Sequence, residues 1–221
     1  MNRRGAGLAE LLSAIFLLTF LFAGTVLIFQ AGTRGFQQAS KRLGSVGDAE
    51  RFSRVVKRDI TLTHYGSLET KQRSASTPDG LVRRDGLSLA GLSDWADPAN
   101  FQDTQPLWNR HVVLYSTQEK HGRLFRLEID AGGAFQVNDP FTNFNACLMD
   151  SPGGIPGLGR VTMLTKEVYS FEVTLDPGRR LVQFRLLLFH QGGTRMLSQA
   201  RADEYQELRM TLFPKNTYPD L

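Results

Sequence analysis

The chain has 221 residues and a single cysteine, Cys147, so it cannot form an internal disulfide. A folded domain in this chain must therefore be stabilised by its hydrophobic core alone. We interpret Cys147 as a small, buried, apolar side chain rather than as a nucleophile.

Motifs of catalysis and metal binding are missing as well. There is no H-E-x-x-H zinc motif, no G-x-S-x-G nucleophile elbow, and no Gly-Lys-Ser/Thr after the glycine-rich stretch 153–159. The histidines lie on different predicted elements, and none has a cysteine or a second histidine at ligand spacing. They are His64, His111, His121 and His190. We therefore expect no catalytic residue, no metal site and no cofactor, so the chain is not expected to be an enzyme.

No charged side chain occurs between Leu11 and Thr33. Residues 11–29 are almost wholly apolar, and as a helix these 19 residues rise about 28 Å, close to the ~30 Å hydrocarbon core of a bilayer. The pattern predicts a membrane-spanning helix. A carboxylate, Glu10, stands at the start of this run, where it costs a few kcal/mol unless it finds a partner. A simple membrane anchor does not require that carboxylate.

The segment Arg3-Arg4-Gly5-Ala6-Gly7-Leu8-Ala9-Glu10, with the apolar run after it, resembles the class III signal of type IV prepilins and type II secretion pseudopilins. The resemblance implies that residues 1–5 are a leader and that a prepilin peptidase cleaves between Gly5 and Ala6. It further implies N-methylation of Ala6 and a role for Glu10 in subunit docking. Ala6 departs from the family pattern, which most often has Phe or Met at the first mature position.

The same resemblance implies a location and a set of partners. The chain would be a single-pass protein of the inner (cytoplasmic) membrane with an extracytoplasmic C-terminal head, and would later join a pilus or pseudopilus. Its partners would be other pilin or pseudopilin subunits, the prepilin peptidase, the inner-membrane assembly platform and the membrane. Basic residues flank the apolar run on both sides, so the loop charges do not set its orientation.

Two other interpretations of the N-terminus were weighed, an ordinary secretory signal and an uncleaved signal anchor. The apolar run is longer than the 7–15 residues of a secretory core, and no clean A-x-A site follows it. Neither interpretation explains Glu10.

No proline precedes Pro78, and apolar residues recur at helical spacing well beyond the membrane run. This pattern predicts one helix from about Gly7 to about Leu62, with a transmembrane and assembly half (6–30) and an amphipathic upper half (31–62). The upper half carries an apolar stripe that is expected to cover a sheet. The stripe consists of Phe36, Ala39, Leu43, Val46, Phe52, Val55, Val56 and Ile60.

Residues 63–221 are expected to form a globular head in which the hydrophobic period becomes two. The sequence predicts a hairpin of 80–84 with 86–90, a second hairpin of 112–116 with 123–130, and strands at 161–175, 181–190 and 207–213. Loops are expected at 67–78, 91–106 and 138–160. Alternation over the last strands predicts antiparallel pairing with one face packed and one face solvated.

The expected fold class is therefore α+β, with a long N-terminal helix packed on an antiparallel β-sheet head. That arrangement is similar to the pilin architecture. The pattern of the final strands is similar to the J-type minor pseudopilins and the W-type minor pilins.

The charges are distributed unevenly. Residues 34–58 carry seven basic and two acidic side chains, whereas residues 59–221 carry 17 basic and 19 acidic ones. A slightly acidic head is a poor general nucleic-acid binder, because phosphate neutralisation supplies non-specific affinity. The basic stalk is expected to meet anionic lipid or acidic neighbours, or simply to be a solvated helix face.

Asp94, Asp97 and Asp103 offer oxygen ligands of the kind that Ca²⁺ prefers. They lack the spacing of a known calcium loop, so a solvated loop is the favoured interpretation.

Two functions follow from these observations. The first is a minor pilin or pseudopilin, a structural subunit that acts in assembly initiation or at the tip of a filament serving secretion, motility or DNA uptake (competence). The alternative is a membrane-anchored extracytoplasmic binding domain that does not enter a filament. Gly5 and Glu10 together favour the first.

Overall fold

The computed structural model describes residues 4–77, 80–139, 141–189 and 205–217. The chain divides into two compact units. Among the described residues, one unit contains residues 4–43, and the other, the head unit, contains those from Gly44 onwards.

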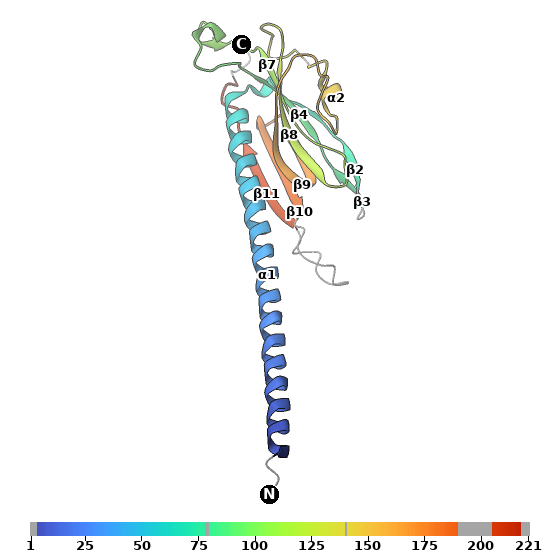
Figure 1. The fold of residues 1–221 in the computed structure, drawn as a ribbon. Helices are drawn as coiled ribbons and strands as arrows, with labels where there is room; N and C mark the ends of the chain where they lie inside the picture. Colours follow the sequence, from blue (N-terminus) through green and yellow to red (C-terminus); the bar gives the residue numbers. More distant parts are fainter. Residues whose placement is uncertain (1–3, 78–79, 140, 190–204, 218–221) are drawn as a thin grey trace. The chain divides into compact units, whose positions relative to one another are not determined.

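Helix α1 spans Arg4–Leu62, so the long helix predicted from the sequence is confirmed (Figure 1). The absence of proline allows its backbone ladder to continue through 59 residues. A short 3₁₀ turn, Tyr65–Ser67, follows. The His64 Nδ1 atom accepts a hydrogen bond from the Gly66 amide at 2.9 Å and caps this turn.

The head unit contains a sheet of seven described strands in the order β1-β4-β7-β8-β9-β10-β11. Every neighbouring pair in this sheet is antiparallel. The strands are β1 (Glu69–Lys71), β4 (Gly86–Gly91), β7 (Arg110–Ser116), β8 (Gly122–Asp130), β9 (Leu158–Asp176), β10 (Leu181–Phe189) and β11 (Tyr205–Leu212). The head is therefore an α+β unit with a helix on an antiparallel sheet.

Two small ribbons and a short helix complete the described head. Strands β2 (Ser74–Thr77) and β3 (Gly80–Arg83) form one ribbon, and β5 (Phe101–Gln102) and β6 (Gln105–Pro106) form the other. The 3₁₀ turn Pro98–Asn100 precedes β5, and helix α2 spans Phe144–Cys147.

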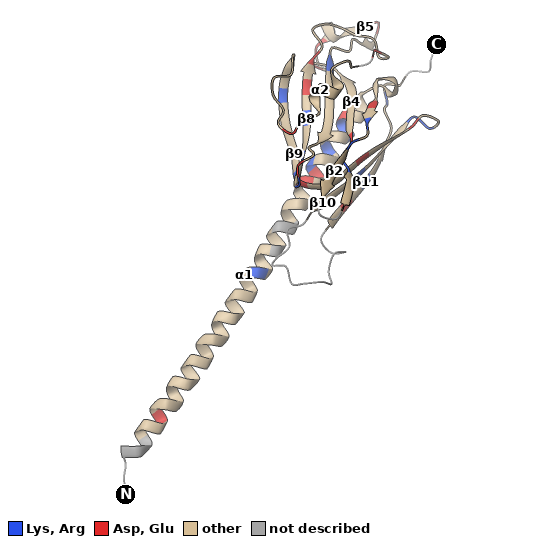
Figure 2. Ribbon diagram, turned by 90° about the vertical axis from the view of Figure 1, so that its right-hand side faces the viewer, with Lys and Arg blue, Asp and Glu red and all other residues tan. Residues whose placement is uncertain are grey.

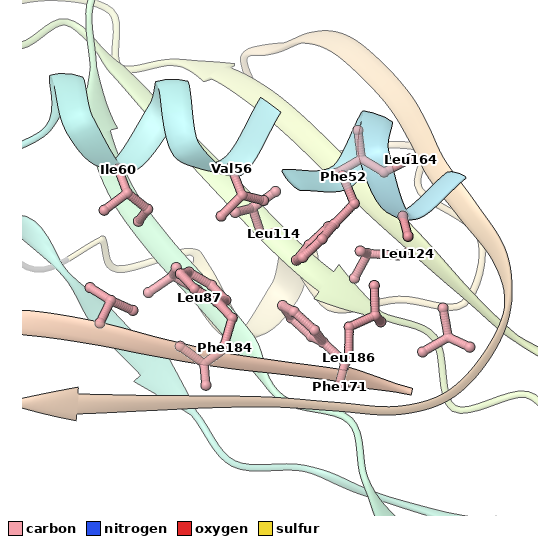
Figure 3. Close-up of a cluster of buried hydrophobic side chains, with 14 of the residues drawn as sticks. Phe52, Val56, Ile60, Leu87, Leu114, Leu124, Leu164, Phe171, Phe184 and Leu186 are labelled. Carbon is pink, nitrogen blue, oxygen red and sulfur yellow. The ribbon is translucent and has the colours of Figure 1, made fainter. Parts of the chain in front are cut away.

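The main hydrophobic core lies between the C-terminal part of α1 and one face of the sheet. Figure 3 shows Phe52, Val56 and Ile60 pointing from the helix into this core. All three side chains are fully buried. The Phe52 ring packs edge-on against Phe171 and Phe184, at centroid distances of 6.0 and 6.3 Å. The sheet contributes Leu87, Leu89, Val112, Leu114, Leu124, Leu164, Val168, Phe171, Val173, Val182, Phe184, Leu186 and Leu188.

A second core covers the opposite face of the central strands. From the sheet it receives Val113, Tyr115, Phe125, Leu127 and Ile129. The segment 141–155 covers these residues with the buried side chains of Phe144, Cys147, Leu148 and Ile155. Strands β7 and β8 are therefore packed on both faces, between α1 on one side and α2 with its flanking loops on the other.

Several predicted elements are confirmed. The hairpin of 112–116 with 123–130 is present as β7 and β8. The strands predicted at 161–175, 181–190 and 207–213 correspond to β9, β10 and β11, although His190 lies outside the described residues. Leu208, Met210 and Leu212 of β11 pack against the main core, as the alternation predicted.

The hairpin predicted around Arg84-Asp85-Gly86 is wrong. Strand β3 pairs with β2, whereas β4 lies between β1 and β7 in the large sheet. The chain crosses between the two sheets at Arg84 and Asp85. Here the Asp85 amide donates to the Phe171 carbonyl and the Arg84 amide donates to the Arg73 carbonyl, both at 2.8 Å.

The loop predicted at 67–78 is also wrong, because it contains β1 and β2. β1 is a three-residue edge strand with polar side chains, so no apolar alternation marks it. Within the predicted loop 138–160 the structure has helix α2 and the beginning of β9. Within 91–106 it has β5, β6 and one 3₁₀ turn.

The apolar stripe of α1 is shorter than expected. Its packed part in the head unit runs from Ala49 to Ile60, and Val46 is 43% exposed. Phe36 and Leu43, which belong to the other unit, are 75% and 73% exposed. Helical spacing alone predicts an apolar face without indicating how much of that face has a partner.

Candidate functional site: the N-terminal apolar helix and the helix–sheet ion network

The residues singled out at the N-terminus lie in the first turns of α1. The backbone of Gly5 and Ala6 belongs to the helix, which begins at Arg4. Residues 1–3 of the expected leader lie outside the described part of the chain. Glu10 follows Ala6 by four positions, and residues at this spacing share one side of a helix.

Residues Gly7–Gln37 form a segment long and apolar enough to cross a membrane. Its large apolar side chains from Leu8 to Phe29 are between 42% and 76% exposed. Such a surface is unfavourable in water, because monomeric soluble proteins rarely expose so large an apolar area. Length and composition therefore suggest a membrane anchor. In Figure 2 α1 shows a red segment near its start and no further charged segment until a blue one well along the helix.

The hydroxyl groups in this apolar segment are all satisfied within the helix. Ser13, Thr19 and Thr25 donate to the carbonyl oxygen four residues earlier at 2.7, 2.7 and 2.8 Å, and Thr33 makes the same kind of bond. Unsatisfied polar groups cost several kcal/mol each in a bilayer core. These bonds remove that cost, so the polar residues in the run are compatible with a hydrocarbon environment.

Glu10 differs from these hydroxyl residues. Its side chain is exposed, and no group in the described part of the chain pairs with its carboxylate. In a bilayer a carboxylate would need a cation or hydrogen-bond donors. Cleavage after Gly5 would create one candidate within the same helix, the amine of Ala6. A neighbouring chain could provide the same group.

In the head unit, an ion network joins α1 to the sheet. Asp59 of α1 pairs with Arg126 of β8 through two contacts, Nε–Oδ2 at 2.6 Å and Nη2–Oδ1 at 3.1 Å. Arg126 also pairs with Glu128, and Glu128 accepts a bond from Arg110 at 3.1 Å. The Asp59 and Arg126 side chains are only 7% and 12% exposed. The network forms part of the lining of a cavity of about 290 Å³, together with Arg58, Leu62 and Trp95.

The network shifts the pKa values of two of its members. Burial opposes ionisation of Glu128, but the hydrogen bond and charge of Arg126, with the charge of Arg110, outweigh burial and lower its pKa. Burial also acts against the Arg126 cation, yet Asp59 and Glu128 raise its pKa above the usual value. Glu128 and Arg126 are therefore charged near neutral pH, and the network is the arrangement expected of a structural contact that fixes α1 on the sheet.

Each of the described histidines makes its own kind of local contact. The His64 ring caps a turn, and the His121 Nδ1 lies 2.7 Å from the Glu167 carboxylate. The His111 ring is stacked between Phe135 and Phe141 at 4.2 Å from each, and burial lowers its pKa. His190 lies outside the described residues.

Cys147 is buried, and its Sγ donates to the Asn143 carbonyl at 3.2 Å. Burial raises the pKa of this thiol to about 11, so it is protonated near neutral pH.

In the candidate calcium loop, two carboxylates accept hydrogen bonds from backbone amides within local turns. Asp94 accepts a hydrogen bond from the Ala96 amide at 2.8 Å, and Asp97 accepts one from the Ala99 amide at 2.9 Å. Among the residues that the structure describes, no group of three or more His, Cys, Asp or Glu side chains is placed to hold a metal ion.

One buried feature was missed by the sequence analysis. Arg84 is fully buried, and its guanidinium donates to the carbonyl oxygens of Thr117 at 2.8 Å, of Tyr169 and Lys120 at 3.2 Å, and of Glu119. It thereby fixes the turn between β7 and β8. A Cβ on Gly122 would lie 2.7 Å from the Arg84 Nη1 atom, so glycine is needed there. Nothing local to Arg84 in the sequence signals this role, because its partners are distant along the chain.

Comparisons of this chain with protein-family models, with curated proteins and with solved structures found no match.

Proposed function

We propose that this chain is a minor pilin or pseudopilin, a structural subunit of a type IV pilus or a type II secretion pseudopilus. The observation that carries the proposal is the order of features on α1. Gly5, Ala6 and Glu10 stand immediately before an uncharged segment of membrane-spanning length, and the same helix continues into a head where it packs on an antiparallel sheet. This order resembles the pilin plan.

In the proposed pathway, the prepilin peptidase cleaves between Gly5 and Ala6 on the cytoplasmic face of the inner membrane. The new Ala6 amine is then methylated, and the head remains on the extracytoplasmic side. The chain enters the growing filament through the inner-membrane assembly platform, where it acts in initiation or at the tip.

Glu10 is assigned the docking role because it is the one carboxylate beside the apolar segment, with no partner in the described part of the chain. A lone carboxylate and a lone amine are each costly in the membrane, and pairing them removes both costs. Pairing between neighbouring subunits would set the axial register of each new subunit before the apolar helices bundle. The head then acts through shape and contacts, not through catalysis.

The experiment is recovery of partner pilins from membranes by tagged full-length protein. Glu10→Ala should leave the protein inserted and folded while reducing partner recovery, and Glu10→Asp should be intermediate because its carboxylate is one methylene shorter. Glu69→Ala, which removes an exposed carboxylate from the head, is the matched control and should recover partners as wild type does. Equal recovery by wild type and Glu10→Ala would remove the docking role from Glu10.

A further inference from the structure

One side of α1 in the head unit carries four cations, Arg51, Arg54, Lys57 and Arg58, with a single carboxylate, Glu50. All five side chains are exposed. At 100° per residue they fall within an arc of about 120°. That arc lies opposite the helix side that packs on the sheet. We call these five residues the basic face.

The cations of the basic face have no carboxylate partner among the described residues. Several arginines elsewhere on the head do form ion pairs. The paired arginines include Arg110, Arg123, Arg126, Arg185 and Arg209. Arg58 shares a cavity with Asp94 of the same chain. Arg51, Arg54 and Lys57 are not among the residues lining that cavity, and a positive surface of this kind selects partners of opposite charge.

The same chain also carries a negatively charged surface. The segment 93–105, which we call the acidic loop, contains Asp94, Asp97 and Asp103, all exposed. No lysine or arginine occurs between Gly91 and Asn109. None of the three carboxylates forms an ion pair with a described residue.

Hydrogen bonds and ring contacts stabilise the acidic loop. The Asn100 side-chain amide donates to the Asp94 carbonyl at 2.7 Å, and its Oδ1 accepts from Asn109 Nδ2 at 2.8 Å. The Trp95 ring packs edge-on against Trp108 and Phe101, each with a centroid distance of 6.1 Å. These contacts restrain the loop and so reduce the entropy cost of ordering it when a partner binds.

We propose that the basic face of one copy of this chain binds the acidic loop of a second copy. The two surfaces differ, so the contact is heterologous, and each bound copy leaves one surface of each kind free to bind another copy. Anionic lipid is the competing occupant, and the crosslinking experiment below distinguishes it from a second copy. The inference uses only residues of the head unit and does not depend on the N-terminal signal.

The test is site-directed crosslinking between two differently tagged copies of the full-length chain, in membranes and in detergent micelles. One copy carries Glu50→Cys on the basic face, and the other carries Ala96→Cys in the acidic loop. A short bismaleimide should join these two copies, while chains that contain only the buried Cys147 should not react. Raising NaCl from about 50 to about 500 mM should reduce the yield several-fold, because exposed charge pairs are screened.

Charge reversal then tests the pairing itself. Arg51, Arg54 and Lys57 are changed to Glu in the Glu50→Cys copy, or Asp94, Asp97 and Asp103 to Lys in the Ala96→Cys copy. Either change alone should abolish the crosslink, and combining the two reversed copies should restore it. Arg58 is left unchanged because it lines the same cavity as Asp94 within one copy. Reversing Lys71, Lys120 and Arg179, all exposed on other surfaces, is the matched control and should leave the yield unchanged.

Circular dichroism of each variant verifies the fold of the head, since every altered side chain is exposed. Asp94 and Asp97 also cap local turns, so restoration of the crosslink by the two reversed copies together is the result that separates lost pairing from a disturbed loop. The absence of any crosslink between copies, or a crosslink that neither reversal changes, would overturn the proposal. So would a crosslink from Glu50→Cys only to lipid or to a different protein. Success or failure here leaves processing at Gly5 and docking through Glu10 undecided, so the two proposals are tested independently.

Discussion

Asp59 on helix α1 and Arg126 on strand β8 form a two-contact ion pair that is almost completely removed from solvent. It ties the helix to the centre of the sheet, where Arg126 also pairs with Glu128. Removing Asp59 leaves the buried Arg126 cation with Glu128 as its remaining carboxylate partner among the described residues, and losing part of a buried ion network is costlier than losing an exposed pair.

Asp59→Asn should therefore lower the free energy of unfolding by about 3 kcal/mol. Arg185→Ala is the comparison, since its pairs with Glu172 and Glu207 are exposed and should be worth less than about 1 kcal/mol. Urea unfolding of the full-length protein in detergent, followed by circular dichroism of the sheet, measures both. Equal losses in the two variants would show that the Asp59–Arg126 pair does not fix the helix.

The two phenylalanines of the predicted α1 stripe should behave differently. Phe52 is fully buried against Phe171 and Phe184, so Phe52→Ala should cost about 3–5 kcal/mol. Phe36 is 75% exposed, and Phe36→Ala should stay within about 0.5 kcal/mol in the same unfolding measurement. A large loss from Phe36→Ala would mean that the stripe packs farther down the helix than the structure indicates.

Truncation tests the helix as the cover of the sheet. Proteins that begin at residue 31 or at residue 44 should both fold, because the packed part of α1 starts at Ala49. A protein that begins at residue 63 should fold poorly, because the sheet loses Phe52, Val56 and Ile60 from its main core. Circular dichroism and thermal melting compare the three proteins. Equal stability of the proteins starting at 44 and 63 would contradict the packing described here.

Acid should weaken the head through Glu128. Its pKa is lower in the folded head than the ordinary 4.5, so the unfolded chain takes up a proton first as the pH falls. The stabilisation is fully present above pH 4.5 and is lost as the pH falls from there through the folded-state pKa. Glu128→Gln should therefore be less stable than wild type at pH 6, and the difference should shrink towards pH 3. Urea titrations across this range measure it, and a constant difference would exclude this contribution.

The sequence analysis predicted the helices and strands whose residue pattern lies within one short stretch of the chain. Helical spacing and the lack of proline identified α1, and alternation at positions such as Phe171, Phe184 and Leu208 identified β9, β10 and β11 with the correct face inward. The hairpin of β7 with β8 followed from the same alternation on both sides of a short polar turn.

The structural elements that the sequence analysis missed depend on contacts between residues that are far apart in the sequence. Strand β1 exists because Thr70 pairs with Leu87 of β4, and the polar sequence of β1 gives no sign of that partner. Asp59 and Arg126 lie 67 positions apart, on a helix and a strand, so no spacing rule connects them. The second core was not predicted from the sequence for a related reason. Its residues Phe144 and Ile155 are flanked by Asn, Pro and Gly residues, which are typical of loops.

The central claim is that the N-terminus is a prepilin-type processing signal, and the sequence of the mature N-terminus tests it most directly. Full-length protein is recovered from membranes of cells that contain a prepilin peptidase, and its N-terminal peptide is identified by mass spectrometry. Our account predicts a chain that begins at Ala6 and carries a methyl group on its amine, whereas a Gly5→Leu variant retains Met1. An intact Met1 in the wild-type protein, or a start near residue 24 or 32, would contradict the account.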